Sequence, residues 1–367
     1  MFNLTTQQHI EDFTRGCCFF ATGGGGDPLF GQKMLREVLD AGKQINIIDV
    51  SELKEDAWTV CPYLMGAAPG PEVVALQQEK EKYGLTQEVI LNMPMAAAQL
   101  LLKQQQVRLD AVIPLELGAA ATASAVATAA MLDVPTVDGD FEGRALPEIA
   151  QMLPALNNYN LFPLASCDAY GNQIIIEKAI NQQMTERMGK LIATASFSLV
   201  GQATLLMRLK HLKPVLLPQT LSKALAVGAA LRQARETNSI QSIIELTQAK
   251  ILFRGRVVKR QAEIKDGYYV GDIYIEGADS FKGDQLKIWF KNENILSWLN
   301  GNPYIACPDL ITMIDQSDFE PVINGKLLEG TEVIVFGLQA PEAFRTSAAL
   351  KVLEPKHFGF DFQAKTL

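Results

Sequence analysis

The chain is poor in histidine, and its cysteines lack the spacing of a zinc site. Among 367 residues there are only three histidines, His9, His211 and His357, each alone in its segment. The five cysteines are scattered and include no C-x-x-C pair, which is typical of reduced, mostly buried thiols. The sequence therefore argues against a zinc centre built from cysteine or from three histidines.

An excess of basic charge and long hydrophobic runs are also missing. The chain has 33 basic and 41 acidic residues, a formal net charge of -8, without the basic block expected of a nucleic-acid binder. The stretch 115–132 is mostly Ala and Thr and is too weakly hydrophobic to predict a membrane span. The polar first ten residues do not resemble a secretory leader. We therefore expect a cytoplasmic protein with a small-molecule substrate and neither nucleic acid nor membrane as partner.

The pattern of apolar residues predicts two domains. With 48% hydrophobic and 20% charged residues, the chain has the profile of a globular protein long enough for two cores. Up to residue 140, short apolar runs alternate with helical patterns, which predicts an N-terminal three-layer α/β/α domain with a mainly parallel sheet. After residue 250, short β-type runs divided by glycine turns predict a β-rich, barrel-like C-terminal domain. We place these domains at 1–165 and 251–367, and expect 166–250 to complete the first or to connect the two.

The apolar periodicity also predicts individual elements. In the N-terminal part, strands are expected at 17–21, 45–50, 111–117 and 135–137, and helices at 32–39, 87–104 and 119–132. A hairpin is expected between 164–167 and 173–177, followed by helices at 181–195, 199–210, 222–237 and 239–248. The C-terminal strands are expected at 251–260, 267–276, 285–291, 303–307, 310–315 and 332–336.

Four consecutive glycines, Gly23, Gly24, Gly25 and Gly26, precede Asp27 and a proline. We interpret them as a turn between a strand and a helix, where N–H groups without nearby Cβ atoms can cradle a substrate. The spacing is neither G-x-G-x-x-G nor a Walker loop with its lysine, so no nucleotide cofactor is expected. Asp27 favours a neutral or amide-like ligand, and a tight turn without a ligand is the alternative.

A second unusual segment is the acidic loop at 138–148, directly after a predicted strand. Asp138, Asp140 and Glu142 are carboxylates that can act as general bases or hold Mg²⁺ or Mn²⁺, and Arg144 can neutralise them or dock a carbonyl. A metal-free site and a solvated acidic turn are the alternatives. Glu116 ends another predicted strand within an apolar run, where a carboxylate is paired or functional. Ligands of open α/β sheets bind at the carboxyl ends of strands, so we expect these loops to meet the glycine run.

Together with residues 65–69 (MGAAP), 292–294 (NEN) and 307–311 (CPDLI), these motifs resemble the S-methyl-thiohydantoin desulfurase family over residues 7–360. The resemblance implies the same two domains and a hydrolysis in which water replaces a methylthio group on a five-membered cyclic thiohydantoin, giving a hydantoin and a thiol. For this reaction we expect Asp138 or Asp140 as base or metal ligand, Arg144 as electrostatic stabiliser, Glu116 as a further catalytic candidate, and the glycine run, Asp27 and Glu142 as substrate-binding groups.

An alternative is a non-catalytic subunit that binds a small metabolite or a hydantoinase/oxoprolinase-type enzyme. The residues after Glu116 read Leu-Gly-Ala-Ala-Ala, where the family usually has an amide that could hold a substrate carbonyl. The apolar faces of several predicted helices also suggest a homo-oligomer.

Overall fold

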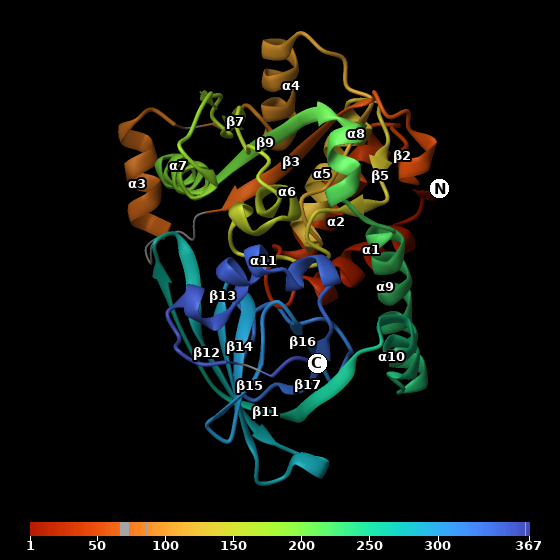
Figure 1. Ribbon diagram of the computed structural model, residues 1–367, viewed down its shortest axis with the longest axis vertical. Helices are drawn as coiled ribbons and strands as arrows, with labels where there is room; N and C mark the ends of the chain where they lie inside the picture. Colours follow the sequence, from red (N-terminus) through yellow and green to blue (C-terminus); the bar gives the residue numbers. More distant parts are fainter. Residues whose placement is uncertain (67–72, 86, 364) are drawn as a thin grey trace.

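The computed structural model describes residues 1–66, 73–85, 87–363 and 365–367, and its two sheets lie one above the other in Figure 1. The first sheet has the strand order β1-β2-β5-β4-β3-β9-β7-β8. Its strands are β1 (Phe2–Leu4), β2 (Ile45–Ile48), β3 (Trp58–Gly66), β4 (Ala111–Val112), β5 (Thr136–Val137), β7 (Leu164–Cys167), β8 (Gln173–Ile176) and β9 (Leu199–Arg208). The strands β2, β5, β4 and β3 run parallel, and the outer strands are antiparallel. The predicted α/β domain is confirmed.

The second sheet is antiparallel and curled, with the order β15-β14-β13-β12-β11-β17-β16. Its strands are β11 (Lys250–Lys265), β12 (Tyr268–Gly277), β13 (Gln285–Lys291), β14 (Glu293–Leu299), β15 (Asn302–Ala306), β16 (Leu310–Asp315) and β17 (Glu332–Leu338). The predicted β-rich C-terminal part is thereby confirmed. A separate two-stranded ribbon joins β6 (Gly139–Asp140) to β10 (Leu217–Pro218).

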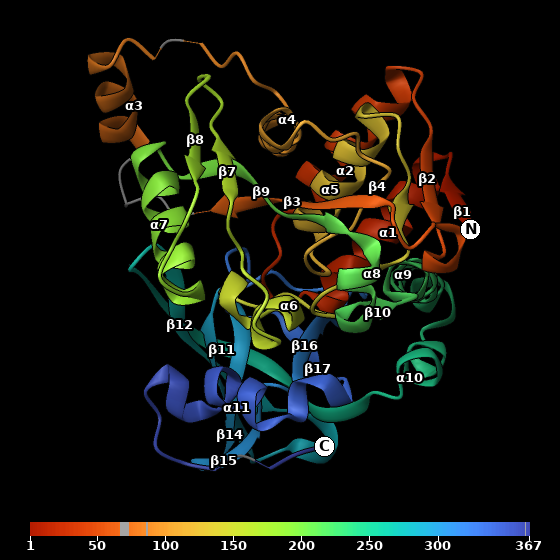
Figure 2. The ribbon, with the colours of Figure 1, turned by 45° about the horizontal axis from the view of Figure 1, so that its top comes forward.

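Helices surround the first sheet and fill the junction between the two sheets, as Figure 2 shows from a second side. Their bounds are α1 (Gln7–Phe20), α2 (Pro28–Asp40), α3 (Val73–Lys82), α4 (Met93–Gln105), α5 (Ala119–Met131), α6 (Leu153–Leu156), α7 (Gln182–Ala195), α8 (Leu209–Leu212), α9 (Thr220–Thr237), α10 (Gln241–Thr247) and α11 (Ser347–Leu353). Within the described ranges, none of the helices combines the length and the apolar character that crossing a bilayer requires.

Two predicted elements are wrong in type. Residues 17–21 were expected as a strand, yet Cys17 to Phe20 form the last turn of α1, whose buried face is continuous because α1 packs along α9. Residues 199–210 were expected as a helix, but Leu199–Arg208 form β9, which lies between β3 and β7. An inner strand that is buried on both faces does not alternate, so its periodicity resembles that of a buried helix.

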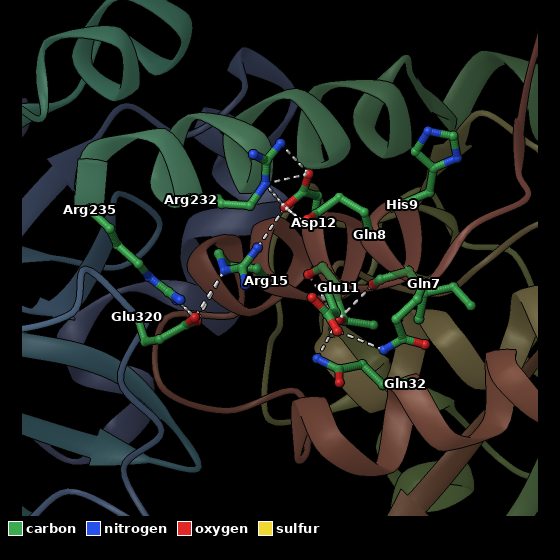
Figure 3. A network of polar contacts seen from close by, with 12 residues as sticks. Gln7, Gln8, His9, Glu11, Asp12, Arg15, Gln32, Arg232, Arg235 and Glu320 are labelled. Atoms are coloured by element: carbon green, nitrogen blue, oxygen red, sulfur yellow. Dashed lines mark hydrogen bonds and ion pairs between the residues drawn. The ribbon is translucent and has the colours of Figure 1, made fainter. Parts of the chain in front are cut away.

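A polar network ties α1 to α9 and to the second half of the chain (Figure 3). The carboxylate of Asp12 on α1 accepts from Arg15 at 2.7 Å and forms an ion pair with Arg232 on α9 at 3.0 Å. Arg15 also reaches Glu320, which in turn pairs with Arg235. Asp12 and Arg15 are buried, so each charge depends on its partner.

One apolar core is shared by both halves of the chain. It includes Leu115 and Phe141 from the first half and Ile295, Leu296 and Phe344 from the second, all of them buried. The junction between the two sheets is therefore a packed interior, and it fixes the position of side chains that approach from either side.

Candidate functional site

A cavity of about 490 Å³ lies where the two halves of the chain meet. The α/β part contributes the glycine run, the end of β3, residues 115–121 and part of α7, and the curled sheet contributes the starts of β12 and β14. Side chains that could interact with a ligand line its wall: Asp27, Phe30, Tyr63, Glu116, Lys190, Tyr269, Asn292 and Glu293. A concave, mostly apolar pocket with a few polar groups is the usual form of a small-molecule site.

The glycine run joins two helices and does not follow a strand as we had predicted. It leaves α1 and enters α2, where Asp27 caps the helix by accepting the N–H of Leu29 at 3.1 Å. Gly25 has a φ of +68° and lies against Gly118, so that a Cβ atom there would come within 2.5 Å of the Gly118 Cα. The Gly25 carbonyl accepts the N–H of Ala120 at 3.0 Å. The sequence prediction that the glycine run meets the loop after Glu116 is confirmed in the backbone.

The run also holds a carboxylate that the sequence did not single out as a candidate. Glu293 begins β14, is only 4% exposed, and its carboxyl fills the space that a Cβ atom on Gly24 would need. Burial raises the pKa of Glu293 to about 7, although Arg144, Lys190 and the N–H of Gly25 act against the increase. Within the described chain, Glu293 Oε2 has no hydrogen-bond partner. A carboxyl group with a pKa near neutrality can both accept and return a proton.

Our expectation that the N–H groups of Gly24 to Gly26 form a ligand cradle needs a correction at Gly24 and Gly25. The Gly24 N–H donates to the Ala21 carbonyl at 3.0 Å, and the Gly25 N–H stabilises the carboxylate of Glu293. The glycine run thus places a catalytic candidate at the cavity, because the absence of Cβ atoms lets a carboxyl group approach the backbone closely.

Glu116 is a second carboxyl group in the wall of the cavity. Its position is set by backbone hydrogen bonds on either side: Phe141 N–H donates to Leu115, and Leu117 N–H to Arg144, both at 3.1 Å. Glu116 Oε2 accepts the N–H of Leu146 at 3.3 Å. Burial and the nearby charge of Glu293 raise the pKa of Glu116 well above its usual range, so the surroundings of this carboxyl group favour its protonated form.

Asp138 and Asp140 lie behind the cavity and do not line it. Asp138 Oδ1 accepts the N–H groups of Leu221 and Ser222, both at 3.0 Å, at the start of α9. Asp140 Oδ1 accepts the N–H groups of its own turn, from Glu142 at 2.6 Å and Gly143 at 2.5 Å. Both carboxylates are engaged by backbone donors, as a helix cap and a turn require.

Arg144 is buried at 2% exposure and links three separate segments. Its guanidinium donates to acceptors in the turn between α1 and the glycines, in β14 and in the turn before β16: Thr22 Oγ1 at 2.9 Å, Asn294 O at 3.2 Å, Pro308 O at 3.2 Å and Asp309 O at 3.3 Å. Its Nε donates to Ala145 O at 2.9 Å. The expected electrostatic effect is exerted at a distance, since the Arg144 charge opposes the rise in the pKa of Glu293.

Lys190 is another cavity residue that the sequence did not reveal. It lies on α7, donates to the Gly66 carbonyl at 2.6 Å and stands 4.4 Å above the ring of Tyr268. Burial lowers the pKa of Lys190, and the charges of Glu186 and Glu293 oppose this. The signal available in the sequence was weak: one lysine on the otherwise buried face of a predicted helix.

The acidic residues do not form a metal-binding set. Among residues 1–66, 73–85, 87–363 and 365–367, no three histidine, cysteine, aspartate or glutamate side chains converge as a metal ion requires. The proposed Mg²⁺ or Mn²⁺ ligands, Asp138 and Asp140, bond to backbone N–H groups instead. The donor set therefore favours acid–base chemistry by the side chains themselves.

Fold and site together define a two-part protein with a carboxyl-lined cavity between an α/β unit and a curled β-sheet. The family described as S-Me-THD-like, N-terminal domain, matches residues 8–178, and the one described as S-Me-THD-like, C-terminal domain, matches residues 180–367. The chain belongs to the S-Me-THD-like family, which confirms the resemblance stated above and indicates a role related to thiohydantoins.

A solved structure supports the fold independently. The crystal structure of a protein from Chromobacterium violaceum is similar over 100% of both chains, with a TM-score of 0.79 and 22% sequence identity. No curated protein matched the chain. At this identity the structural likeness supports the fold and carries no functional detail.

Proposed function

We propose that the protein is a hydrolase that replaces the methylthio group of an S-methyl-thiohydantoin, or of a closely related cyclic amide, by water. The observation that supports this proposal is that two carboxyl groups, those of Glu116 and Glu293, line the same cavity. Glu293, with a pKa of about 7, suits a general base, and Glu116, with a pKa held well above its usual range, suits a general acid. Two titratable groups whose pKa values are pushed apart by their surroundings are typical of acid–base catalysis.

The reaction balances with these two groups alone. Glu293 takes a proton from water as the water oxygen bonds to the ring carbon that carries sulfur, and Glu116 gives its proton to the ring nitrogen. The new hydroxyl group then returns a proton to Glu116 as the carbonyl forms and the carbon–sulfur bond breaks. The departing methanethiolate takes the proton from Glu293. Both carboxyl groups return to their starting states, and the products are a hydantoin and methanethiol.

The remaining lining fits an uncharged ring. Tyr63, Tyr269 and Phe30 offer aromatic surfaces around the carboxyl pair, and stacking on such surfaces suits a flat heterocycle. Asp27 and the ionised form of Glu293 place negative charge on the wall, which Lys190 offsets only in part, and this disfavours phosphate-bearing ligands.

The test is turnover of a 2-methylthio-imidazolone, measured by release of methanethiol. We expect Glu293→Gln and Glu116→Gln each to reduce kcat by roughly 10²- to 10⁴-fold, the usual contribution of a general acid or base. Glu55→Gln is the matched control, because Glu55 is exposed and pairs with Lys213 away from the cavity. Full activity of both cavity variants would end the proposal.

A second candidate function is a non-catalytic subunit that binds a cyclic amide for a hydantoinase/oxoprolinase-type enzyme. It is favoured by Ala120 and Ala121, which line the cavity where the family usually has an amide. The result that would select it is hydantoin binding by calorimetry without turnover, combined with co-purification of a large ATP-dependent amidohydrolase.

A further inference from the structure

Lys190 is a cation in the cavity wall that has no part in the proton transfers described above. Among the described residues that line the cavity there is no other lysine, and no arginine or histidine. Lys190 is only 8% exposed, and an ammonium group in the interior loses its hydration. A buried cation needs acceptors, so the contacts of this group decide what else it can bind.

The protein satisfies the ammonium group of Lys190 only in part. Its Nζ donates to the Gly66 carbonyl at 2.6 Å and lies 4.4 Å from the centre of the Tyr268 ring. Within the described residues it has no other hydrogen-bond acceptor and forms no ion pair with a carboxylate. An ammonium group has three N–H donors. One bonds to the carbonyl and the ring accepts at most one more, so a donor remains for a ligand.

The position of the ammonium group is fixed by the contact between α7 and β12. The hydroxyl group of Tyr268 donates to Glu186 Oε1 at 2.7 Å, and Glu186 Oε2 accepts the N–H of Ile149 at 3.0 Å. Glu186 lies four residues before Lys190 on α7, which places both side chains on one face of the helix. Glu186 therefore holds the ring of Tyr268 against Lys190 and fixes the direction from which Lys190 meets the cavity.

A second lysine beside the same ring shows the opposite arrangement. Lys291 Nζ lies 4.0 Å from the centre of the Tyr268 ring, but it forms an ion pair with Glu148 at 2.5 Å. Lys291 does not line the cavity. Its charge is thus compensated within the protein, whereas the charge of Lys190 is left to the cavity.

We propose, on the basis of the function proposed above, that Lys190 binds the ring carbonyl oxygen of the cyclic amide and selects rings that have this carbonyl. We had expected Glu142 to bind the substrate, but its side chain is completely buried and does not line the cavity. Attack of water on the carbon that bears sulfur moves electron density to the ring nitrogen and, by conjugation, to the carbonyl oxygen. A fixed cation at this oxygen stabilises that charge, and Lys190 neither gives nor takes a proton.

The test is calorimetric binding of two rings that differ only at this carbonyl. Hydantoin has it, and 2-imidazolidinone is the same ring with a methylene group in its place. The wild-type protein should bind hydantoin about 10- to 100-fold more tightly, as expected for a hydrogen bond to a charged group. Lys190→Met keeps an unbranched side chain against the Tyr268 ring and should lose this preference, so that the two rings bind within about threefold of each other.

The matched control is Lys291→Met, which removes a cation beside the same ring but outside the cavity. It should retain the preference for hydantoin within about twofold. A preference that survives in Lys190→Met, with both rings weakened equally, is the sign of a structural role and would overturn the proposal.

Two results on the wild-type protein need no variant to fold. Equal affinity for the two rings, or no detectable binding of hydantoin, would overturn the role of Lys190. If the wild-type protein has the preference, Lys190→Met loses it and no methanethiol is released, the role of Lys190 stands and the proposed hydrolase fails. Turnover without the preference would have the reverse meaning.

Discussion

Substitution of Glu293 by glutamine should make the protein more stable at alkaline pH while it strongly reduces kcat. The folded-state pKa of Glu293 is about 7, against an ordinary pKa of 4.5 for a glutamate, so the folded protein binds this proton more tightly than the unfolded chain does. Stability from the protonated form is fully present below about pH 4.5 and is lost as the pH rises through about 7. The difference of about 2.5 units corresponds to about 3.5 kcal/mol at most, since one unit is about 1.4 kcal/mol.

The assay is urea unfolding of the wild-type protein and Glu293→Gln at about pH 5 and pH 8. Part of the pH-dependent change in stability occurs below about pH 5 or above about pH 8. Between the two pH values, the free energy of unfolding of the variant should therefore gain about 2 to 3 kcal/mol relative to the wild type. The neutral amide escapes the ionisation penalty, and the Gly25 N–H still finds an acceptor in its side-chain oxygen. Parallel pH profiles of the two proteins, within about 0.5 kcal/mol, would show that Glu293 is not a strained buried carboxylate, and the argument for a general base would fail.

Two further predictions concern the residues that hold the site in place. Gly25→Ala should lower the free energy of unfolding in urea by about 2 to 4 kcal/mol, because a positive φ and the contact with Gly118 act together. The control is Gly42→Ala, which has a similar φ of +72° but lies in open space and should lower the free energy of unfolding by only about 1 kcal/mol. Equal losses in the two variants would refute the role of close packing. Arg144→Met should lower the free energy of unfolding by about 3 to 5 kcal/mol, since it leaves one hydroxyl group and several carbonyl groups, all buried and from three segments, without their donor. A loss below about 1 kcal/mol in the same assay would show that these contacts are dispensable.

Much of the fold could be predicted from the sequence because its signals are local. The hairpin of β7 and β8 has a Gly-Asn turn between two apolar runs, and α7, α9 and α10 have clear helical periodicity. The prediction failed where burial removes the periodicity, as in the last turn of α1 and in β9. The strand β14 was not predicted because it starts with the polar residues Glu293 and Asn294.

The candidate site was predictable only in part, for a related reason. The glycine run and Glu116 are unusual within their own segments, so sequence alone could identify them. The functional interest of Glu293 depends on contacts with Gly24 and Gly25, which lie far away in the chain. The acidic loop was misleading, since carboxylates that cap a helix or close a turn, as Asp138 and Asp140 do, occur in the same kind of segment as carboxylates that react.

The shared apolar core has an evolutionary consequence. Glu116 comes from one half of the chain and Glu293 from the other, and the packed junction sets their separation when the protein folds. A chimera that joins the first half of this chain to the second half of a distant relative would need two surfaces that had never adapted to each other. Recombination among related proteins should therefore be tolerated at the outer edges of the two sheets and selected against at the junction between them.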